Sequence, residues 1–280
     1  MKKIFICILI LIMLSGCSSK KEALYIASDF EMHYDELDQL MEYVNEDSKV
    51  QGYTVKYAFI NGDNGKEQDD LYSLKDLTSY ISDGIDGLSF NNINYIFGSH
   101  DSGADTTGTN GFLYGGYEFD NFYVYAIDFY EMTDANDALD GVNHFNEWLA
   151  TIKTGKPILI FSHVPMHERR KDNFGASAWF DAISEAANDY DILFFWGHNH
   201  SGETGLDDEM DFLKPGTSIK IEGKSEESTL NFYYINDGYI TQGVSVVLLF
   251  NGDGTLTYRP VYIEKDGFHD EICETVELTH

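Results

Sequence analysis

The chain has 280 residues and a formal net charge of −30 at pH 7, from 18 Lys and Arg against 48 Asp and Glu. This excess of acid argues against a nucleic-acid-binding protein, because phosphate polyanions are bound through Lys and Arg, and against electrostatic docking on anionic lipid. Hydrophobic residues make up 43% of the chain and aromatic residues 15%, which is enough to build a sizeable core and excludes a wholly disordered chain.

The first residues have the pattern of an export signal. Two lysines precede an apolar run of eleven residues, 4–14, which is too short to cross a membrane as a helix. The run ends in Leu14-Ser15-Gly16-Cys17, which resembles a bacterial lipobox, in which the cysteine is lipidated and the preceding peptide is removed. We expect a signal peptide over 1–16, a tether over 17–22, and a lipid anchor on Cys17 that holds the chain on the outer face of the cytoplasmic membrane, or on an outer membrane if one exists. The alternative is an ordinary secretory signal with an incidental cysteine.

Strands and helices then alternate along the chain. A nearly all-apolar run at 23–28 predicts a strand buried on both faces, and apolar residues at helical spacing over 37–44 predict a helix. The same pair of patterns recurs as a strand over 53–60 and a helix over 71–81. Further strands are predicted over 93–97, 157–161 and 192–196, helices over 142–152 and 179–187, and a hairpin over 117–129 that turns at Asp120-Asn121.

The chain beyond Gly205 changes to strands and turns. Runs over 245–250 and 255–263 flank Asn251-Gly252-Asp253-Gly254, which is a strong hairpin signal, and Pro260 places the second run at an edge or a bulge. Strand–helix alternation over 23–200 implies an α/β fold with right-handed crossovers. We expect the later strands to form a second sheet packed on the first, in one domain over 23–265 followed by an acidic C-terminal tail over 266–280.

Candidate metal ligands and acid/base groups stand where the predicted strands end. Six of the nine histidines lie within a few residues of a strand end, and ligand sites in open α/β sheets lie beyond the carboxyl ends of the strands. Mixed imidazole and carboxylate ligands suit Mn, Fe or Zn better than Ca or Mg. Asp63 after Gly62, considered alone, is typical of a turn. Because it is one of several such residues at strand ends, we interpret it as a metal ligand.

The order of these residues resembles the calcineurin-like metallophosphoesterases, whose motifs are D-x-H, G-D, G-N-H-[DE], a lone H and G-H-x-H. Here the motifs read Asp29-Phe30-Glu31, Gly62-Asp63, Gly98-Ser99-His100-Asp101, Ser162-His163 and Gly197-His198-Asn199-His200. The resemblance covers residues 23–200. It implies a four-layer α/β/β/α metallophosphoesterase-type sandwich of two mixed sheets flanked by helices.

The resemblance also implies a centre of two divalent metal ions. Its protein ligands would be Asp29 and His200 on the first ion, His163 and His198 on the second, and Asp63 as a bridge between them. His100 would not bind metal. It would act as a general acid on the leaving oxygen or stabilise charge on the phosphoryl group, with Asp101 as its orienter.

Two motif positions depart from the family pattern. Glu31 replaces a histidine, and it could reach the same ion because residues i and i+2 of an extended segment face the same way; His33 is the alternative if the loop bulges. Ser99 replaces an asparagine ligand and is a weaker donor, whose place water could fill. The added negative charge of Glu31 favours a harder ion such as Mn²⁺ over Zn²⁺.

A basic run follows the fourth motif. Arg169 or Arg170 could orient a phosphate group by charge-assisted hydrogen bonds, although a solvated helix start is the alternative for this run. His167, four residues after His163, either lines the substrate site or faces solvent.

These observations favour a surface-tethered, metal-dependent hydrolase of phosphate esters, in which a metal-bound hydroxide attacks phosphorus. The sequence does not decide between mono- and diesters. A small phosphorylated substrate fits best, because so acidic a chain repels nucleic acid. The alternative is a catalytically degenerate relative, a binding or scaffolding lipoprotein, which the changes at Glu31 and Ser99 motivate. A solute-binding lipoprotein would need two lobes and a hinge, which the sequence does not show clearly. It also gives no oligomeric state.

Overall fold

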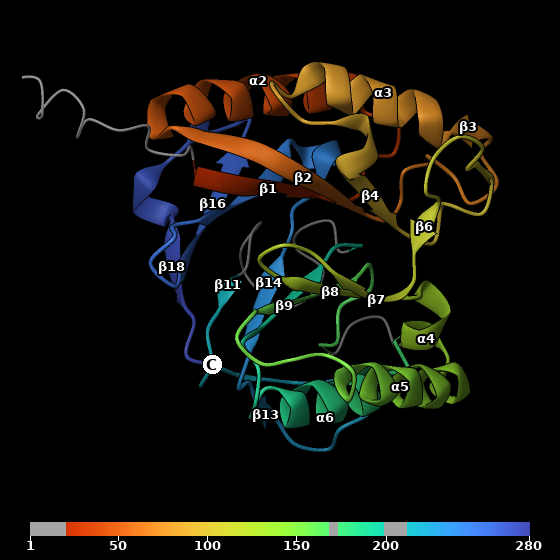
Figure 1. Ribbon diagram of the computed structural model, residues 1–280. Helices are drawn as coiled ribbons and strands as arrows, with labels where there is room; N and C mark the ends of the chain where they lie inside the picture. Colours follow the sequence, from red (N-terminus) through yellow and green to blue (C-terminus); the bar gives the residue numbers. More distant parts are fainter. Residues whose placement is uncertain (1–20, 168–172, 199–211) are drawn as a thin grey trace, which may run out of the picture.

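Two β-sheets lie face to face, and helices cover the outer face of each (Figure 1). This is a computed structural model, which describes residues 21–167, 173–198 and 212–280. The four-layer α/β/β/α sandwich that the sequence predicts is confirmed. Elements close to the predicted ranges form because apolar runs of five to nine residues are buried as strands, while the amphipathic stretches between them form helices.

The first sheet has β1 (Lys21–Ala27) near its centre. On one side β1 runs parallel to β2 (Tyr53–Asn61), and β4 (Ile93–Ile96) and β6 (Phe112–Leu113) continue the parallel order. On the other side β1 is antiparallel to β15 (Val244–Phe250), which pairs with β16 (Thr255–Tyr262). Helices α2 (Tyr34–Gln51) and α3 (Leu74–Gly84) cover its outer face.

The second sheet is built from the middle of the chain. Its strands, in spatial order, are β11 (Phe212–Leu213), β14 (Tyr233–Asn236), β10 (Ile192–Trp196), β9 (Ile158–Ser162), β8 (Tyr123–Ile127) and β7 (Gly115–Glu118). The four central strands are parallel, and the β7–β8 hairpin confirms the turn predicted at Asp120-Asn121. The helices on this side are α4 (Phe129–Thr133), α5 (Ala135–Leu149) and α6 (Ala176–Ala186).

Short elements complete the described residues. Two small ladders pair β3 (Tyr72–Ser73) with β5 (Ala104–Asp105) and β12 (Ser218–Ile219) with β13 (Ser228–Thr229). Single 3₁₀ turns lie at η1 (Phe90–Asn92), η2 (Ile240–Gln242) and η3 (Asp270–Ile272).

The C-terminal strands differ from the sequence prediction. β15 and β16 extend the sheet of β1, because β15 is buried on both faces and hydrogen-bonds along the open side of β1, whereas β11 and β14, also beyond Gly205, join the second sheet. The segment 266–280 is not a free tail, since β17 (Gly267–Phe268) and β18 (Glu274–Glu277) both pair with β16. Pro260 lies between the part of β16 that pairs with β18 and the part that pairs with β17. The backbone N–H that proline lacks is therefore not needed for either pairing. At the other end, β1 begins at Lys21, two residues inside the expected tether.

The apolar layer between the sheets explains why the strands read as continuous hydrophobic runs. Leu24 and Ile26 of β1 belong to this layer, whereas Tyr25 of the same strand belongs to the cluster beneath α2 and α3. The ring of Phe59 stacks on that of Phe161 across the layer, with centroids 4.8 Å apart. The sheets are thereby held so that the carboxyl ends of their parallel strands meet at one edge of the sandwich.

Candidate metal centre

The loops that follow six parallel strands meet at this edge. They carry the predicted motif residues Asp29 after β1, Asp63 after β2, Ser99 and His100 after β4, His163 after β9 and His198 after β10, and Asp237 follows β14. Two groups among the described residues have ligand atoms within 4.8 Å of one another: Asp63 with His163 and His198, and Asp63 with Glu31 and His100. Asp63 belongs to both groups, as a bridging ligand would.

Asp63 is held in place by the backbone around it. It is 2% exposed and has a left-handed φ of 52°. Its Oδ1 accepts hydrogen bonds from the backbone N of His100 at 2.8 Å and from Ser99 Oγ at 3.1 Å. His163 Nε2 lies 3.1 Å from the other carboxylate oxygen, Oδ2. The strand-end loops of both sheets therefore converge on one carboxylate.

His163 has its tautomer fixed by a backbone carbonyl. The ring is fully buried, and Nδ1 donates to the Asn61 carbonyl at 2.7 Å. Nε2 is thereby directed at Asp63 and at Nδ1 of His198, 3.1 Å away. A carbonyl that holds one ring nitrogen while the other faces a cation is the usual support of a metal-binding histidine.

The charges of Asp63 and His163 support each other. Burial alone would raise the pKa of Asp63, but His163, with smaller contributions from His198 and His100, lowers it well below its ordinary range. Burial alone would lower the pKa of His163, yet the Asp63 carboxylate raises it to about 10. Each group therefore favours the charged form of the other, and a metal ion bound between them would take the place of a proton on the imidazole.

Glu31 reaches the centre by a route that the sequence did not predict. Asp29, Glu31 and Met32 have left-handed φ values of 51°, 42° and 62°, so the segment is a tight turn and not an extended strand. The turn is tied to the next loop by hydrogen bonds from Asp29 N to the Gly62 carbonyl and from Glu31 N to the Asp63 carbonyl, both 3.0 Å. The alternative ligand His33 is not brought in, since its Nδ1 lies 3.3 Å from Glu36 at the start of α2.

His100 lies close to the carboxylates of Glu31 and Asp63. Its Nδ1 is 3.9 Å from Glu31 Oε1 and 3.8 Å from Asp63 Oδ2, and its side chain is 30% exposed. The geometry makes His100 a candidate ligand as well as the general acid that the family resemblance implies.

Asp101 makes different contacts from those expected of a residue that orients the His100 imidazole. Its buried carboxylate accepts hydrogen bonds from Gly98 N at 2.8 Å, Asn64 N at 2.8 Å and the Tyr72 hydroxyl at 2.5 Å. Burial raises the pKa of Asp101, and these hydrogen bonds oppose the rise. Asp101 thus joins the β4 loop to the β2 loop, and it positions His100 through the backbone and not through the imidazole.

A second layer of polar groups lies behind the centre. Asp29 is fully buried, and its Oδ2 accepts from Ser28 Oγ at 2.5 Å and from His198 N at 2.9 Å. Asn61 donates from Nδ2 to Asp237 Oδ2 at 2.6 Å, and burial raises the pKa of Asp237 to about 8. Sequence reasoning missed Asp237, although Asn236-Asp237-Gly238 follows a buried strand and ends it as the other motifs do.

Other predicted site residues lie elsewhere. His167 is 3% exposed, with its ring centroid 4.9 Å from that of Trp196 and its Nδ1 2.9 Å from the Tyr234 hydroxyl. Its burial in the core of the second sheet is at odds with the predicted role in substrate binding. His200, Arg169, Arg170 and Cys17 lie outside the described residues.

The donor set fits divalent metal ions. The buried Asp63 carboxylate forms one group with two imidazoles and a second group with a carboxylate and an imidazole, and Nδ1 of His163 donates to a carbonyl, which leaves Nε2 for a metal ion. Nitrogen and oxygen donors in this mixture suit Mn, Fe or Zn. The residues that would hold the ions are Asp29, Glu31, Asp63, His163 and His198, with His100 beside them.

Comparison with known proteins gives two findings. Residues 1–18 match the model of a prokaryotic membrane lipoprotein lipid attachment site, which confirms the predicted lipoprotein signal and indicates an exported, lipid-anchored protein. No curated protein sequence matches the chain. Among residues 21–167, 173–198 and 212–280 we find no helix with the length and apolar character that crossing a membrane requires.

The second finding concerns the fold. The chain is similar to the structure of GAP50, the anchor in the inner membrane complex of Plasmodium, with 11% identity, a TM-score of 0.59 and coverage of 94% of this chain and 90% of that one. A predicted phosphoesterase from Streptococcus pneumoniae matches with 13% identity, 93% and 99% coverage and a TM-score of 0.39. A 5'-nucleotidase from Candida albicans matches with 10% identity, 94% and 53% coverage and a TM-score of 0.42.

Proposed function

We propose that this lipoprotein hydrolyses phosphate esters at a centre of two divalent metal ions. The observation that carries the proposal is the position of Asp63, which belongs to two separate groups of potential ligands at the edge where six strand-end loops meet. The motif residues that keep the family pattern, Asp29, Asp63, His100, His163 and His198, and their order along the chain support the same reaction. When bound, the ions would bring a water molecule to a nucleophilic state at neutral pH and offset charge that develops on the phosphoryl group.

In this proposal the protein residues divide the remaining work. Asp29, Glu31, Asp63, His163 and His198 hold the ions, and His200 completes the set. Asn61 fixes His163 through its carbonyl. His100, which is 30% exposed, passes a proton to the leaving oxygen, a role worth about 10²–10⁴-fold in rate. Arg169, which lies outside the described residues, orients the phosphate.

The test uses the lipidated chain in detergent, assayed on an aryl phosphate monoester and an aryl phosphate diester with Mn²⁺ or with chelator. We expect hydrolysis that needs metal and that falls at least about 10²-fold in Asp63→Asn and His198→Ala, together with a loss of bound metal measured by mass spectrometry. His33→Ala is the matched control, because its imidazole pairs with Glu36, and it should retain both activity and metal.

The choice of metal has its own variant. Glu31→His restores the family pattern and removes one negative charge, so we expect bound Mn²⁺ to give way to Zn²⁺. Stoichiometric Zn²⁺ in the unaltered chain would contradict this role of Glu31. Bound metal without turnover of either ester would instead favour a binding or scaffolding lipoprotein that has kept the fold.

A further inference from the structure

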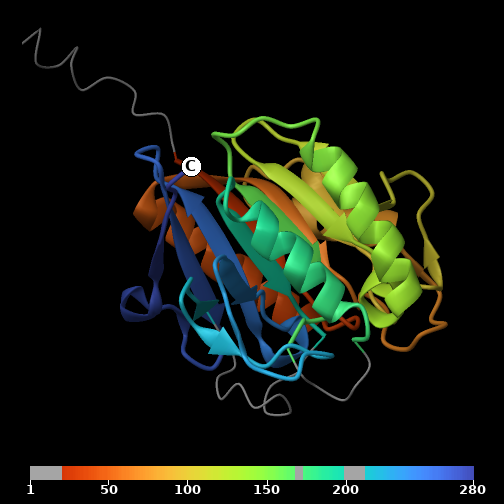
Figure 2. The same cartoon turned by 90° about the horizontal axis from the view of Figure 1, so that it is seen from below.

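The lipid anchor and the metal centre lie at opposite ends of β1. The anchor residue Cys17 is four positions before Lys21, where β1 begins, so it reaches at most about 14 Å from that residue. The strand then runs seven residues to Ala27, a rise of about 20 Å, and Asp29 follows. In Figures 1 and 2 the start of β1 and the C-terminus both lie at the left end of the molecule.

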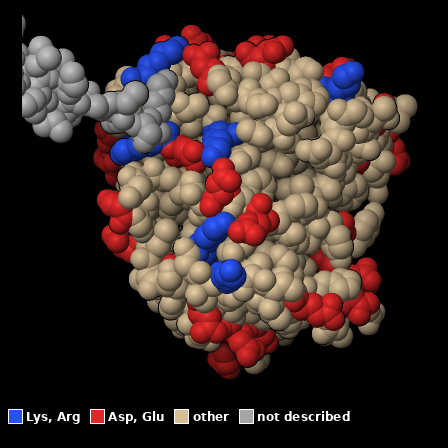
Figure 3. All heavy atoms as spheres, viewed as in Figure 1, with Lys and Arg blue, Asp and Glu red and all other residues tan. Residues whose placement is uncertain are grey.

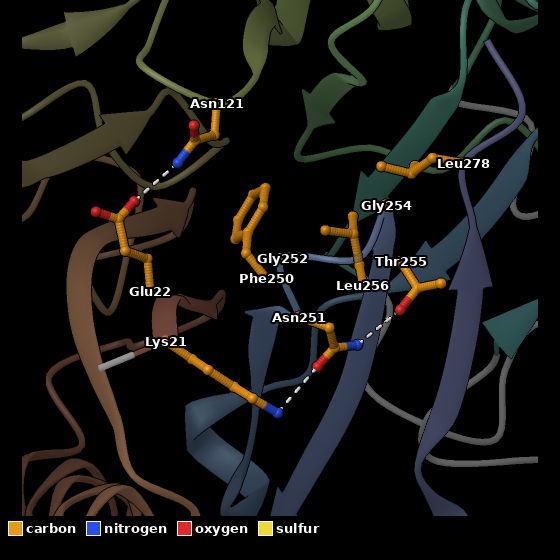
Figure 4. A pocket seen from close by; sticks show the side chains of 10 residues that line it. All are labelled: Lys21, Glu22, Asn121, Phe250, Asn251, Gly252, Gly254, Thr255, Leu256 and Leu278. Carbon is orange, nitrogen blue, oxygen red and sulfur yellow. Dashed lines mark hydrogen bonds between the residues drawn. The ribbon is translucent and has the colours of Figure 1, made fainter. Parts of the chain in front are cut away.

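A pocket opens at the end where the chain leaves toward its anchor. It has a volume of about 470 Å³ and is shown in Figure 4. Phe250, Leu256 and Leu278 give it apolar walls, and Lys21 and Asn121 stand at its side. Lys21 Nζ lies 3.5 Å from Asn251 Oδ1, a long contact for an ammonium group, and Asn121 Nδ2 donates to Glu22 at 2.9 Å. Apolar walls beside polar donors suit the headgroup region of a lipid.

Several lysines lie toward the same end of the molecule. Lysines lie at or near the N-terminal ends of the parallel strands: Lys21, Lys49, Lys56, Lys153 and Lys156. Lys56 Nζ lies 2.8 Å from Glu22 and 2.9 Å from Asp120. On the face shown in Figure 3, most Lys and Arg side chains lie in the left half, interspersed with Asp and Glu, whereas the lower and right margins carry mainly Asp and Glu.

We propose that the end of the molecule around Lys21 rests on the membrane, with lipid headgroups in its pocket, and that the metal centre opens on the far side into the aqueous space. The short tether keeps this end at the bilayer. Anionic lipid repels the mainly acidic margins more than it repels this end, where lysines accompany the acids, and the repulsion disfavours a molecule lying on its side. Given the proposed function, the substrate class is water-borne phosphate esters, and a phospholipid of the same membrane is out of reach.

The orientation is tested without any activity. The full lipidated chain, in vesicles of phosphatidylglycerol and phosphatidylethanolamine, carries one fluorescent donor at Asp253→Cys or at Lys66→Cys, both in a Cys273→Ser background. Asp253 lies in the hairpin beside the pocket, and Lys66 lies three residues after Asp63. We expect energy transfer to a headgroup acceptor to be at least twofold stronger from position 253. Equal transfer, or stronger transfer from position 66, would overturn the proposal.

The pocket and the substrate class have separate readouts in the same vesicles. Lys21→Glu should weaken transfer from position 253, whereas Lys75→Glu, at the start of α3 near the metal-centre edge, should not; equal effects would refute headgroup binding. A soluble aryl phosphate should be hydrolysed at least tenfold faster than phosphatidic acid in the bilayer, and phosphatidic acid in detergent micelles serves as the control for headgroup chemistry. Fast hydrolysis in the bilayer overturns the proposed substrate class. If neither ester is hydrolysed, the proposed function fails, and energy transfer alone decides the orientation.

Discussion

Substitution of Gly98 tests whether metal binding depends on the position of Asp63. A Cβ atom on Gly98 would lie 2.3 Å from the backbone N of Asp63 and 2.5 Å from its Oδ1. Side-chain carbons rarely approach other atoms more closely than about 3.4 Å, so Gly98→Ala would displace the Asp63 backbone by about 1 Å. A backbone neighbour cannot rotate away, and overpacking of this kind costs about 1–3 kcal/mol.

The predicted result is a folded protein with a damaged centre. We expect the melting temperature of metal-free Gly98→Ala to fall by a few degrees, and its metal affinity, measured by isothermal titration calorimetry, to fall about 10–100-fold. Activity should fall by at least as much, because a displacement of about 1 Å at a reacting centre can cost 10²-fold.

Gly84→Ala is the matched control. Its Cβ would also overlap a neighbour at 2.4 Å, but the atoms it meets are Cε and Sδ of Met41, the end of a flexible side chain. Met41 can change rotamer, and alanine favours the helix that Gly84 ends, so metal affinity should be unchanged. Unaltered metal affinity in Gly98→Ala would refute the view that the contact between the β2 and β4 loops sets the position of Asp63.

Three further predictions concern buried polar groups. Tyr72→Phe removes a hydroxyl that donates to Asp101 at 2.5 Å and should lower the free energy of unfolding in urea by about 1.5–3 kcal/mol, with a smaller loss of activity. Burial raises the pKa of Asp237 to about 8, so its contribution to stability is complete below about pH 4 and is lost as pH rises through 8; Asp237→Asn should reduce the fall in melting temperature of the metal-free protein over that range. Asp47→Ala leaves Arg259, which it contacts at 2.7 Å and 3.2 Å, without its buried partner and should cost about 3–5 kcal/mol in urea unfolding.

Two of these variants have a control at the surface. Tyr80→Phe loses a hydroxyl bond to the exposed Asp38 and should change stability little. Glu274→Ala breaks an exposed pair with Lys214 and should cost less than about 1 kcal/mol. If Tyr72→Phe were no worse than Tyr80→Phe, Asp101 would not be the link between loops that the hydrogen bonds indicate. A pH profile of Asp237→Asn identical to that of the unaltered chain would show that Asp237 is ionised in the folded state.

The strand ends were predictable because their signals are local. A buried strand reads as an apolar run, and the first polar residue after it marks the edge of the sheet, which places Asp63, His163 and His198 together without any knowledge of the sheet order. The order itself was not predictable. β15 has an apolar pattern that suits a central position in either sheet, and its hydrogen bonds to β1 join residues more than 200 positions apart in the chain.

The path of the first motif was unpredictable for another reason. Left-handed φ angles occur at Asp29, Glu31 and Met32, and none of these residues is glycine. The residue types in this segment therefore do not indicate a turn. Hydrogen bonds from this turn to the carbonyls of Gly62 and Asp63 hold it, and those carbonyls come from another strand. Strained backbone of this kind persists where surrounding structure determines it, and it concentrates at functional sites.

The balance of charge at the centre gives the strongest physical reason to expect cations there. Ligand atoms of Glu31 and Asp63 lie within 4.8 Å of one another, and Asp29 and Asp63, at the ends of neighbouring strands, are almost fully buried. Like charges in such a place repel unless a cation or a proton offsets them. The Asp63 carboxylate raises the pKa of His163, which lies 3.1 Å away, and burial, with a smaller contribution from Asp29, raises the pKa of Asp237. Metal ions would relieve this repulsion directly. Glu31, which replaces a histidine of the family pattern, therefore need not weaken metal binding. Its carboxylate adds a negative charge that a second divalent ion would offset.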